Sequence, residues 1–346
     1  MNGDLVYVPA SRVTEKQWLK RGDVLIAASS GSLDVVGKAA RIRRDEEVAF
    51  GAFCKVLRPT SEVDAGYFAH FFQTKPYRRH VMRVAAGSNI NNLKGRDLDD
   101  IEILLPPMED QRRVAAVLDA AEALRAKRRH ALSKLEDLIN AVFVEMFSKN
   151  ASDVSWDETT LGEVADIVSG ATPKTSVERY WDGEVRWVTP KDLSGLQGPY
   201  IDTTSRTLSA DGLKSCSASL LPSGSVLLSS RAPIGYVAIN KAPMATNQGF
   251  KSLVPDSSRV DPRFLWAWLR RHRPQLESLG SGATFKEISK RVVEGIDISL
   301  PPIRLQARFG DVLDAVETMR TKLCDMLVEI DALCASLQQR AFRGEL

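Results

Sequence analysis

The chain has 346 residues, long enough for two domains with separate cores, and its 44% hydrophobic and 26% charged residues are ordinary for a soluble globular protein. A net charge of +3 permits a nucleic-acid partner but does not argue for one, so any basic surface must be local. Four scattered cysteines and four histidines form no zinc pattern, so we expect reduced thiols and no metal. Neither a signal segment nor an apolar run of about 20 residues is present, so we expect a cytoplasmic location.

The first half of the chain predicts a mixed set of elements. Residues 19–31 (LKRGDVLIAASSG) read as a turn and a strand, and residues 64–74 (DAGYFAHFFQT) as an amphipathic helix with aromatic residues on its buried face. Residues 86–98 (AGSNINNLKGRDL) form a small-residue loop before a short helix. Residues 101–107 (IEILLPP) alternate like a half-buried strand that the prolines end. Residues 108–147 then carry one apolar stripe, uninterrupted by Pro or Gly, which predicts a long helix.

Every one of these blocks recurs in the second half of the chain, at a shift that drifts from about 202 to 195 residues, as small loop insertions would produce. The matching segments are residues 221–233 (LPSGSVLLSSRAP), 261–271 (DPRFLWAWLRR), 280–292 (GSGATFKEISKRV), 296–302 (IDISLPP) and a second long helix at 303–342. The sequence is therefore two copies of one unit.

The repeat predicts a mixed α/β (α+β) fold with two similar globules, each followed by a long helix. We place the first globule at residues 1–107, its helix at 108–150, the second globule at 151–302 and its helix at 303–346. A helix of this length spans roughly 60 Å at about 1.5 Å per residue, too long to hide its stripe in its own globule. We expect the two helices to pack antiparallel, like a coiled coil, with the globules at opposite ends of a rod related by approximate two-fold symmetry.

The apolar stripe of each helix defines the expected interface between the helices or with a partner. Its residues are Val117, Leu118, Leu124, Leu132, Leu135, Leu138, Val312, Leu313, Met319, Leu323, Leu327, Ile330 and Leu333. The charge run at residues 125–130 (RAKRRH) reads as a solvated helix face, with a contact to the DNA backbone or to a partner as the alternative.

The two copies are unequal. Residues 156–193 of the second copy have no counterpart in the first, because Met1 aligns near Thr203 and about 47 residues of the first globule have no match. The first globule would then expose strand edges. We expect a separate short chain to complete it, with a damaged, truncated gene product as the alternative.

The sequence resembles a known family. The segment LPPMEDQRRVAAVLDAAEALRAKRR is similar to the one that follows each target-recognition domain in specificity (S) subunits of type I restriction–modification systems. LGEVADIVSGATPKTSVERYWDGEVRWVTPKDL resembles the opening of such a domain, SSRAPIGYVAIN…ATNQGF its middle, and QQRAFRGEL the family's C-terminus. The resemblance covers essentially the whole chain. It implies two DNA-reading domains separated by a pair of helices, on which methyltransferase (M) subunits dock and supply the chemistry.

We expect no catalytic residue in this chain. LLPPM and SLPPI have the prolines of an adenine methyltransferase motif but lack the polar residue that would hold the adenine amino group. No GxxxxGK[ST] loop is present, and no Ser/His/Asp arrangement stands out. We therefore expect no cofactor here, with S-adenosylmethionine bound by the M subunit and ATP by a restriction (R) subunit.

DNA reading needs polar side chains on loops that reach base edges, and Lys or Arg on phosphates. The loops of the second copy offer Thr172, Lys174, Lys191, Arg231, Asn247, Gln248, Thr284 and Lys286. The matching loops of the first copy offer Ser30, Ser88, Asn89, Asn91 and Lys94. For each residue, ordinary loop chemistry is the alternative, above all for Asn247 and Gln248, which precede Phe250 and could cap a buried turn. Phe264, Leu265 and Trp268, beside several arginines, are expected in the core because the first copy keeps only their apolar spacing.

These features predict a specificity subunit that directs M subunits, and an R subunit, to a split, asymmetric double-stranded DNA target. The two helices would set the number of unread base pairs between the half-sites. The alternatives are a fused methyltransferase–specificity enzyme, which the length and the absent motifs disfavour, and a coiled-coil scaffold that no longer binds DNA.

Overall fold

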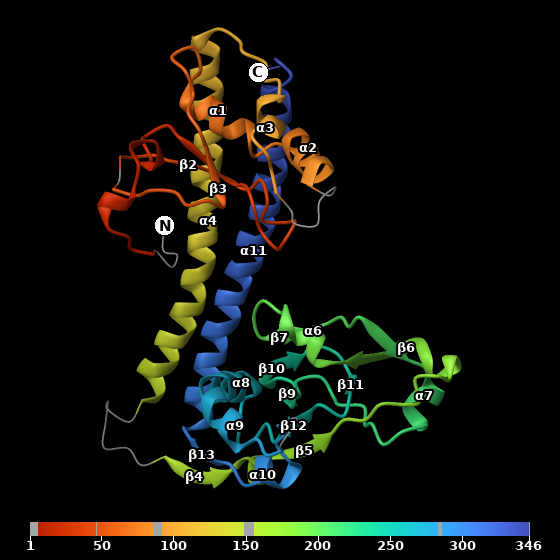
Figure 1. Ribbon diagram of the computed structural model, residues 1–346. Coiled ribbons are helices and arrows are strands. Elements are labelled where there is room, and N and C mark those ends of the chain that lie inside the picture. Colours follow the sequence, from red (N-terminus) through yellow and green to blue (C-terminus); the bar gives the residue numbers. More distant parts are fainter. Residues whose placement is uncertain (1–5, 46, 86–91, 149–155, 283–285, 346) are drawn as a thin grey trace. The chain divides into compact units, whose positions relative to one another are not determined.

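The computed structural model describes residues 6–45, 47–85, 92–148, 156–282 and 286–345 (Figure 1). The chain divides into two compact units. Unit 1 comprises Met1–Ala131 and Leu323–Leu346, and unit 2 comprises Leu132–Lys322. Each unit therefore holds one globule together with about half of each long helix.

Unit 1 contains a three-stranded sheet in the order β2-β1-β3, in which β1 pairs antiparallel with both neighbours. Val24 and Ile26 of β1 are fully buried and pack in one cluster with Tyr77 and Val81 of α2. In chain order, the globule consists of η1 (Ala10–Arg12), η2 (Glu15–Gln17), β1 (Val24–Ala27), β2 (Ala39–Arg41), β3 (Cys54–Leu57), α1 (Ala65–Phe71), α2 (Lys75–Ala85) and α3 (Arg96–Asp99).

Unit 2 has a five-stranded sheet in the order β5-β12-β9-β10-β7, a three-stranded sheet β11-β6-β8 and a two-stranded sheet β13-β4. Its strands are β4 (Asp157–Thr160), β5 (Ala165–Ser169), β6 (Trp181–Val188), β7 (Tyr200–Ile201), β8 (Arg206–Leu208), β9 (Val226–Ser230), β10 (Ile234–Asn240), β11 (Met244–Thr246), β12 (Lys251–Pro255) and β13 (Asp297–Leu300). Its shorter helices are α5 (Leu161–Val164), η4 (Glu178–Tyr180), α6 (Pro190–Ser194), α7 (Ala210–Lys214), α8 (Pro262–Arg271), α9 (Arg273–Leu279) and α10 (Lys290–Glu294).

Helix α8 packs its aromatic side chains into unit 2. Phe264, Leu265 and Trp268 are 1%, 0% and 8% exposed, and the indole N–H of Trp266 donates to the carbonyl oxygen of Val237 in β10 at 3.1 Å. These positions confirm the prediction that the aromatic residues belong to the core, and the arginines at the end of α8 do not frame a base-stacking platform.

The same local structure appears in both units. Asp64 and Asp261 are the N-caps of α1 and α8, and each carboxylate accepts a hydrogen bond from a backbone N–H of the first turn. In the turns before β1 and β9, Gly22 and Gly224 have φ of +93° and +85°, a conformation that favours glycine. The predicted mixed fold with two repeats of one unit is confirmed.

The long helices are α4 (Met108–Phe147) and α11 (Ile303–Ala341), in agreement with the sequence prediction. In unit 1, Leu118 of α4 packs in a cluster with Leu337 of α11, and Arg125 pairs with Asp331 at 2.5 Å. The contacts move backward along α11 as they move forward along α4, so the two helices are antiparallel there (Figure 1).

Within unit 2, the C-terminal end of α4 contacts the N-terminal end of α11 through aromatic rings. The ring of Phe143 lies 5.3 Å from that of Phe309 and 5.7 Å from that of Phe264 in α8. Phe147 contacts the same two rings at 5.6 and 4.9 Å. This end of the helix pair is therefore fixed to the globule of unit 2 by α8.

The predicted apolar stripe agrees only in part with the buried seam. Leu118, Leu132, Leu135, Leu313, Leu323, Leu327 and Ile330 are buried or half-buried, whereas Val117, Leu124, Leu138, Val312, Met319 and Leu333 are exposed by 36% to 54%. These six residues therefore lie outside the helix–helix seam, because each helix carries apolar residues on two faces and spacing alone does not separate them. Their assignment to an interface between the helices or with a partner stays a prediction. The RAKRRH run is also not wholly solvated, since Arg125 pairs with Asp331 and the Nε of Arg128 is buried.

Candidate nucleic-acid interface

The carboxyl ends of several strands of unit 2 lie together. β12 pairs antiparallel with both β5 and β9, so β5 and β9 end at the same edge of their sheet. β6 and β11 are parallel neighbours in the second sheet, and Asn247, which follows β11, donates its N–H to the carbonyl oxygen of Val188 at the end of β6, at 3.0 Å. We call the segments that follow these ends, together with residue 286 beside the bridge between Arg231 and Glu287, the strand-end surface, defined as residues 170–174, 189–191, 231, 247–249 and 286.

The loop after β5 is fixed to the strands beside it. The N–H of Ala171 donates to the carbonyl oxygen of Thr246 at 3.0 Å, and the indole N–H of Trp187 donates to the carbonyl oxygen of Ala171 at 3.1 Å. Gly170 permits this approach, because a Cβ at that position would strike the carbonyl oxygen of Asn247. The loop is thus held in place without using the side chains that we expect to contact DNA.

Thr172 and Gln248 lie side by side although 76 residues separate them, since the hydroxyl of Thr172 donates to Oε1 of Gln248. Lys174 on the same loop is exposed. Asn247 has a structural contact, because its Oδ1 accepts from the N–H of Gly249 at 2.9 Å. The carboxamide of Gln248 is exposed and keeps its amide donors available to a base edge.

Arg231 lies at the end of β9 in a small charge network. Its Nη1 is 3.6 Å from Glu287, and the Nζ of Lys251 is 3.1 Å from the other oxygen of the same carboxylate. The Arg231 side chain is 34% exposed, whereas that of Lys251 is 10% exposed. Arg231 and Lys251 thus share the single carboxylate of Glu287. The guanidinium of Arg231 therefore has further N–H donors with which to bind a phosphate or a guanine.

Lys191 is placed by a short capped helix. Thr189 and Asp192 form a capping box at the start of α6, in which the N–H of Thr189 donates to Asp192 at 2.7 Å. Burial raises the pKa of Asp192, but hydrogen bonds from Thr189 and Ser205 outweigh it and hold this pKa below its ordinary value. The ionised carboxylate accepts the hydrogen bonds that cap the turn, and Lys191 is exposed on this turn.

Glu287 and Lys251 were not predicted from the sequence. A lysine that directly follows Phe250 at the start of a strand was a signal, because a buried ammonium needs a partner. Its partner lies 36 residues away, and no local spacing predicts that distance.

Several predicted residues lie outside the described part of the chain, namely Thr284, Ser88, Asn89 and Asn91. Lys286 is exposed beside Glu287. In unit 1, Lys94 is exposed, and the hydroxyl of Ser30 accepts from the N–H of Ser32 at 3.2 Å.

Unit 1 repeats the backbone arrangement of this surface. The N–H of Leu93 donates to the carbonyl oxygen of Ala28 at 2.8 Å, as that of Ile288 donates to Ser230 at 3.0 Å in unit 2. The edge that holds Arg231 in unit 2 therefore has an equivalent in unit 1, where Ser29 occupies the position of Arg231.

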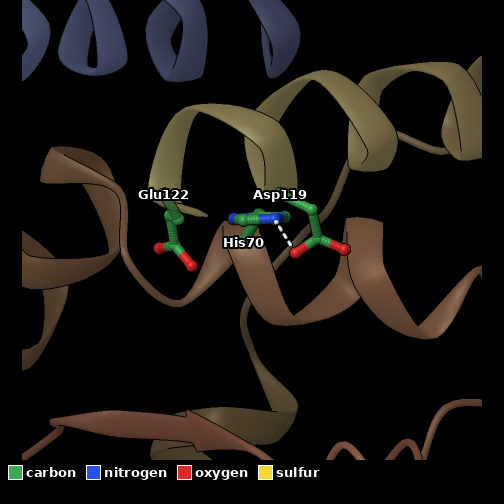
Figure 2. A group of neighbouring side chains, drawn as sticks. All are labelled: His70, Asp119 and Glu122. Carbon is green, nitrogen blue, oxygen red and sulfur yellow. Dashed lines mark hydrogen bonds and ion pairs between the residues drawn. The ribbon is translucent and has the colours of Figure 1, made fainter. Parts of the chain in front are cut away.

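A second polar cluster lies in unit 1, between α1 and α4. The ring of His70 lies between the carboxylates of Asp119 and Glu122 (Figure 2), and the three groups bring possible metal-ligand atoms within 4.8 Å of one another. His70 is 2% exposed, its Nε2 lies 3.1 Å from Asp119, and its Nδ1 is buried without a hydrogen-bond partner.

Two arginines contact the same carboxylates. Arg41 is 3.0 Å from Asp119, and Arg43 is 3.3 Å from Asp119 and 3.7 Å from Glu122. Burial raises the pKa of Asp119, but Arg41, His70 and Arg43 outweigh it and hold this pKa below its ordinary value. The guanidinium groups supply the charge that a metal ion would supply, so the arrangement favours a structural network.

The equivalent carboxylate of unit 2 supports this interpretation. Asp314 accepts from Nη1 of Arg263 at 2.7 Å, and Ala267 stands where unit 1 has His70. The acidic position with an arginine partner is therefore common to both units, and the histidine is not. The prediction that the chain binds no metal stays a prediction.

Comparison with known proteins assigns the family. The family model described as "Type I restriction modification DNA specificity domain" matches residues 12–136 and 153–325, once for each repeat. The chain belongs to this family. Its residues in the strand-end surface lie within the second of these matches.

Two relatives show how far the similarity extends. The type I restriction enzyme MjaIX specificity subunit of Methanocaldococcus jannaschii is 34% identical over 159 residues, which cover 46% of this chain and 37% of that protein. The StySPI specificity subunit of Salmonella potsdam is 27% identical over 99% of this chain and 79% of its own length. The chain thus spans about a third of one relative and about four fifths of the other.

Solved structures share the fold. A chain from a study of complex assembly and conformational transition of the type I R-M system has a TM-score of 0.62 at 22% identity, covering 95% of this chain and 83% of its own. The S subunit of a type I restriction-modification system from M. genitalium has a TM-score of 0.61 at 16% identity, covering 95% and 85%. Among the described residues, no helix has both the length and the apolar character of a membrane span.

Proposed function

We propose that this chain is the DNA sequence-specificity subunit of a type I restriction-modification complex, and that it binds a bipartite, asymmetric site on double-stranded DNA. The strand-end surface of unit 2 is the observation that carries this proposal. It combines cationic side chains suited to phosphates, at Lys174, Lys191 and Lys286, with Arg231 and Gln248, which suit guanine and adenine edges.

Each unit reads one half-site in this proposal. The backbone of the surface recurs in unit 1, but Ser29 replaces Arg231, so the two units present different chemistry to DNA. Different side chains on one scaffold are what an asymmetric target requires. The helices α4 and α11 set the number of unread base pairs between the half-sites.

Exposed apolar residues on the long helices supply a docking face for M subunits. Val117 and Leu124 of α4 are 41% and 42% exposed, and the equivalent Val312 and Met319 of α11 are 36% and 54% exposed. Each pair is seven residues apart, a spacing that suits packing against a partner helix. Equivalent positions in the two units give equivalent faces, so we propose one M subunit for each unit.

In this proposal, the catalytic steps of the complex are carried out by other subunits. The chain is a non-catalytic subunit that works in the cytoplasm, where an M subunit binds S-adenosylmethionine and methylates adenine and an R subunit binds ATP. A separate short chain completes the recognition domain of unit 1.

Selection from random DNA tests the proposed function. The purified complex of M subunits with this chain should enrich a motif of two defined half-sites at a fixed gap, and a complex without sequence preference would support the scaffold alternative. In a host, the same motif should carry methylated adenine only when this chain is present. Methyl transfer by the chain alone, supplied with S-adenosylmethionine, would contradict the non-catalytic assignment and support a fused enzyme.

A further inference from the structure

The two units differ at the segment that precedes each long helix. In unit 2 this segment is β13, which pairs antiparallel with β4 from Asp297 opposite Thr160 to Leu300 opposite Asp157. In unit 1 the equivalent residues 102–105 have no strand partner among the described residues. Leu105 is consequently 49% exposed, whereas the equivalent Leu300 is 6% exposed.

A second difference concerns the edge of the sheet. β12 of unit 2 lies between β5 and β9, whereas its equivalent β3 pairs only with β1 in the described part of unit 1. Phe53, just before β3, is 72% exposed, and the equivalent Phe250 before β12 is fully buried. An open strand edge flanked by exposed apolar side chains is a template for pairing with another polypeptide.

One contiguous segment covers both edges in unit 2. Residues 157–169 run through β4, the single turn of α5 and then β5. Leu161 and Val164 of that turn are fully buried, and Ile167 of β5 is 2% exposed. A backbone hydrogen bond also holds this turn in place, because the N–H of Leu161 donates to the carbonyl oxygen of Ile296 at 2.9 Å. Unit 2 therefore shows which kind of segment covers these edges in the repeat: two strands joined by one helical turn, with buried apolar side chains.

Further exposed apolar residues extend the same surface. Val6, Tyr7 and Val8 precede η1 and are 86%, 91% and 57% exposed. The segment before the corresponding helix α7 of unit 2 is β8, which pairs with β6, and its Leu208 is fully buried. A partner that supplied strands equivalent to β4, β5 and β6 would cover all of these residues.

We infer that residues 53–57 and 101–105 of unit 1 form a docking surface for a separate polypeptide chain. The segment that docks has the pattern of residues 157–169, with a strand, one helical turn and a second strand, and with apolar side chains where unit 2 has Leu161, Val164 and Ile167. A second copy of this chain is a poorer occupant, because its own copy of the segment is buried in its own unit 2. This inference locates the short chain that the proposed function includes, and it depends on the repeat rather than on DNA binding.

Peptide binding to the full chain, without DNA, tests the inference. The probe is a fluorescent peptide with the sequence of residues 157–169, compared with a peptide in which the three apolar residues are replaced by serine. We expect saturable binding of the first peptide only, with hydrogen-exchange protection gained at residues 54–57 and 102–105. The absence of protection at these residues at the highest peptide concentration would overturn the inference.

Two variants control the site of binding. Leu105→Lys places a charge at the open edge and should weaken peptide binding at least tenfold. Val328→Lys alters a residue of α11 in unit 1 that is 70% exposed and should leave binding unchanged. Equal binding by both variants would place the peptide elsewhere and contradict the docking surface. Self-association of the chain that the peptide reverses would make a second copy the occupant, which also contradicts the inference. DNA selectivity is measured separately, so either hypothesis can fail without the other.

Discussion

The side-chain amide of Gln306 donates to the carbonyl oxygen of Pro301 at 2.8 Å, across the double proline that starts α11. Its oxygen accepts from the N–H of Asp261 at 2.9 Å, and its nitrogen also donates to the backbone carbonyl oxygen of Arg259 at 3.1 Å. Gln306 is fully buried. One side chain thus joins the end of β13, the start of the long helix and the N-cap of α8.

Gln111 makes the same set of contacts in unit 1. Its nitrogen donates to the backbone carbonyl oxygens of Pro106 at 2.9 Å and of Glu62 at 3.2 Å, and its oxygen accepts from the N–H of Asp64 at 2.8 Å. A polar side chain that repeats three contacts in two copies is a structural element of the unit. It explains why the double proline and the helix start recur together in the sequence.

Replacing Gln306 by leucine should destabilise unit 2. The substitution leaves one buried N–H and two buried carbonyl groups without partners, which we expect to cost about 3 kcal/mol in total. Urea denaturation of Gln306→Leu, monitored by the fluorescence of the tryptophans of unit 2, measures this change. Gln275→Leu, at an exposed position of α9, is the matched control and should change the unfolding free energy by less than about 0.5 kcal/mol. A similar loss in both variants would show that the three contacts are not responsible.

Gln111 and Gln306 illustrate which features of this fold can be predicted from the sequence and which cannot. The long helices and the repeat could be predicted because periodic apolar residues and the double prolines are local signals present twice. The roles of Gln111 and Gln306 were not predicted, since a glutamine on a helix is usually exposed and only the contacts of the folded chain show that these two are buried. The burial of Leu118 and the exposure of Leu124 likewise depend on which face the partner helix covers.

The candidate site was predicted as residue types and not as an arrangement. Loops rich in Lys, Arg and amides were visible in the sequence, but the contact of Thr172 with Gln248 joins residues 76 positions apart. The role of Glu287, which faces both Arg231 and Lys251, also depends on the sheet that brings β9 and β12 together. Such non-local pairs are set by strand order, which spacing along the chain does not reveal.

Acid should destabilise unit 1 through Asp119. The pKa of this carboxyl is lower in the folded chain than its ordinary value, so its stabilising effect is complete at pH values above the unfolded pKa of about 4 and is lost as the pH falls through the folded pKa. Asp119→Asn should therefore lower the unfolding free energy by about 1–3 kcal/mol at pH 7. The gap between variant and wild type should narrow below about pH 4.

Denaturant unfolding of both proteins from pH 3 to pH 7 measures this dependence. Asp110→Asn is the control, because Asp110 has a more exposed ion pair with Arg113 and should have little effect at any pH. A constant gap between Asp119→Asn and wild type over the whole range would contradict the role of ionisation.

Removing a cation from the strand-end surface should alter DNA binding and leave assembly intact. Arg231→Ala should weaken binding by about 1–3 kcal/mol and relax specificity at one base pair, if the guanidinium reads a base. Lys174→Ala should weaken binding to all sequences and reduce its salt dependence, if the ammonium contacts a phosphate. Lys241→Ala, at the opposite end of β10, should retain wild-type affinity. Loss of M-subunit binding with unchanged DNA affinity would refute the location of the interface.

A charge on the exposed face of α11 should block docking of an M subunit. Met319 is 54% exposed, so Met319→Glu should leave the unfolding free energy nearly unchanged and weaken M binding at least tenfold, because a buried carboxylate without a partner is costly. Calorimetric titration with purified M subunit measures the affinity. Thr321→Glu, at an exposed position on nearly the opposite side of the same helix, tests whether charge alone is responsible. Equal affinities for both variants and wild type would exclude this face from the M interface.

Insertion of seven residues after Ser133 tests the proposed role of the helices. One heptad adds about two turns and preserves the side of α4 on which later residues lie, so both recognition loops keep their own structure. If the helices set the spacing, the selected DNA motif should retain both half-sites and change only in the gap between them. A matching insertion in α11 should be needed if the two helices must stay paired, and the single insertion should then bind no DNA. Random-sequence selection with each variant gives the motif directly. A changed half-site at an unchanged gap would refute the proposal that α4 and α11 determine the spacing.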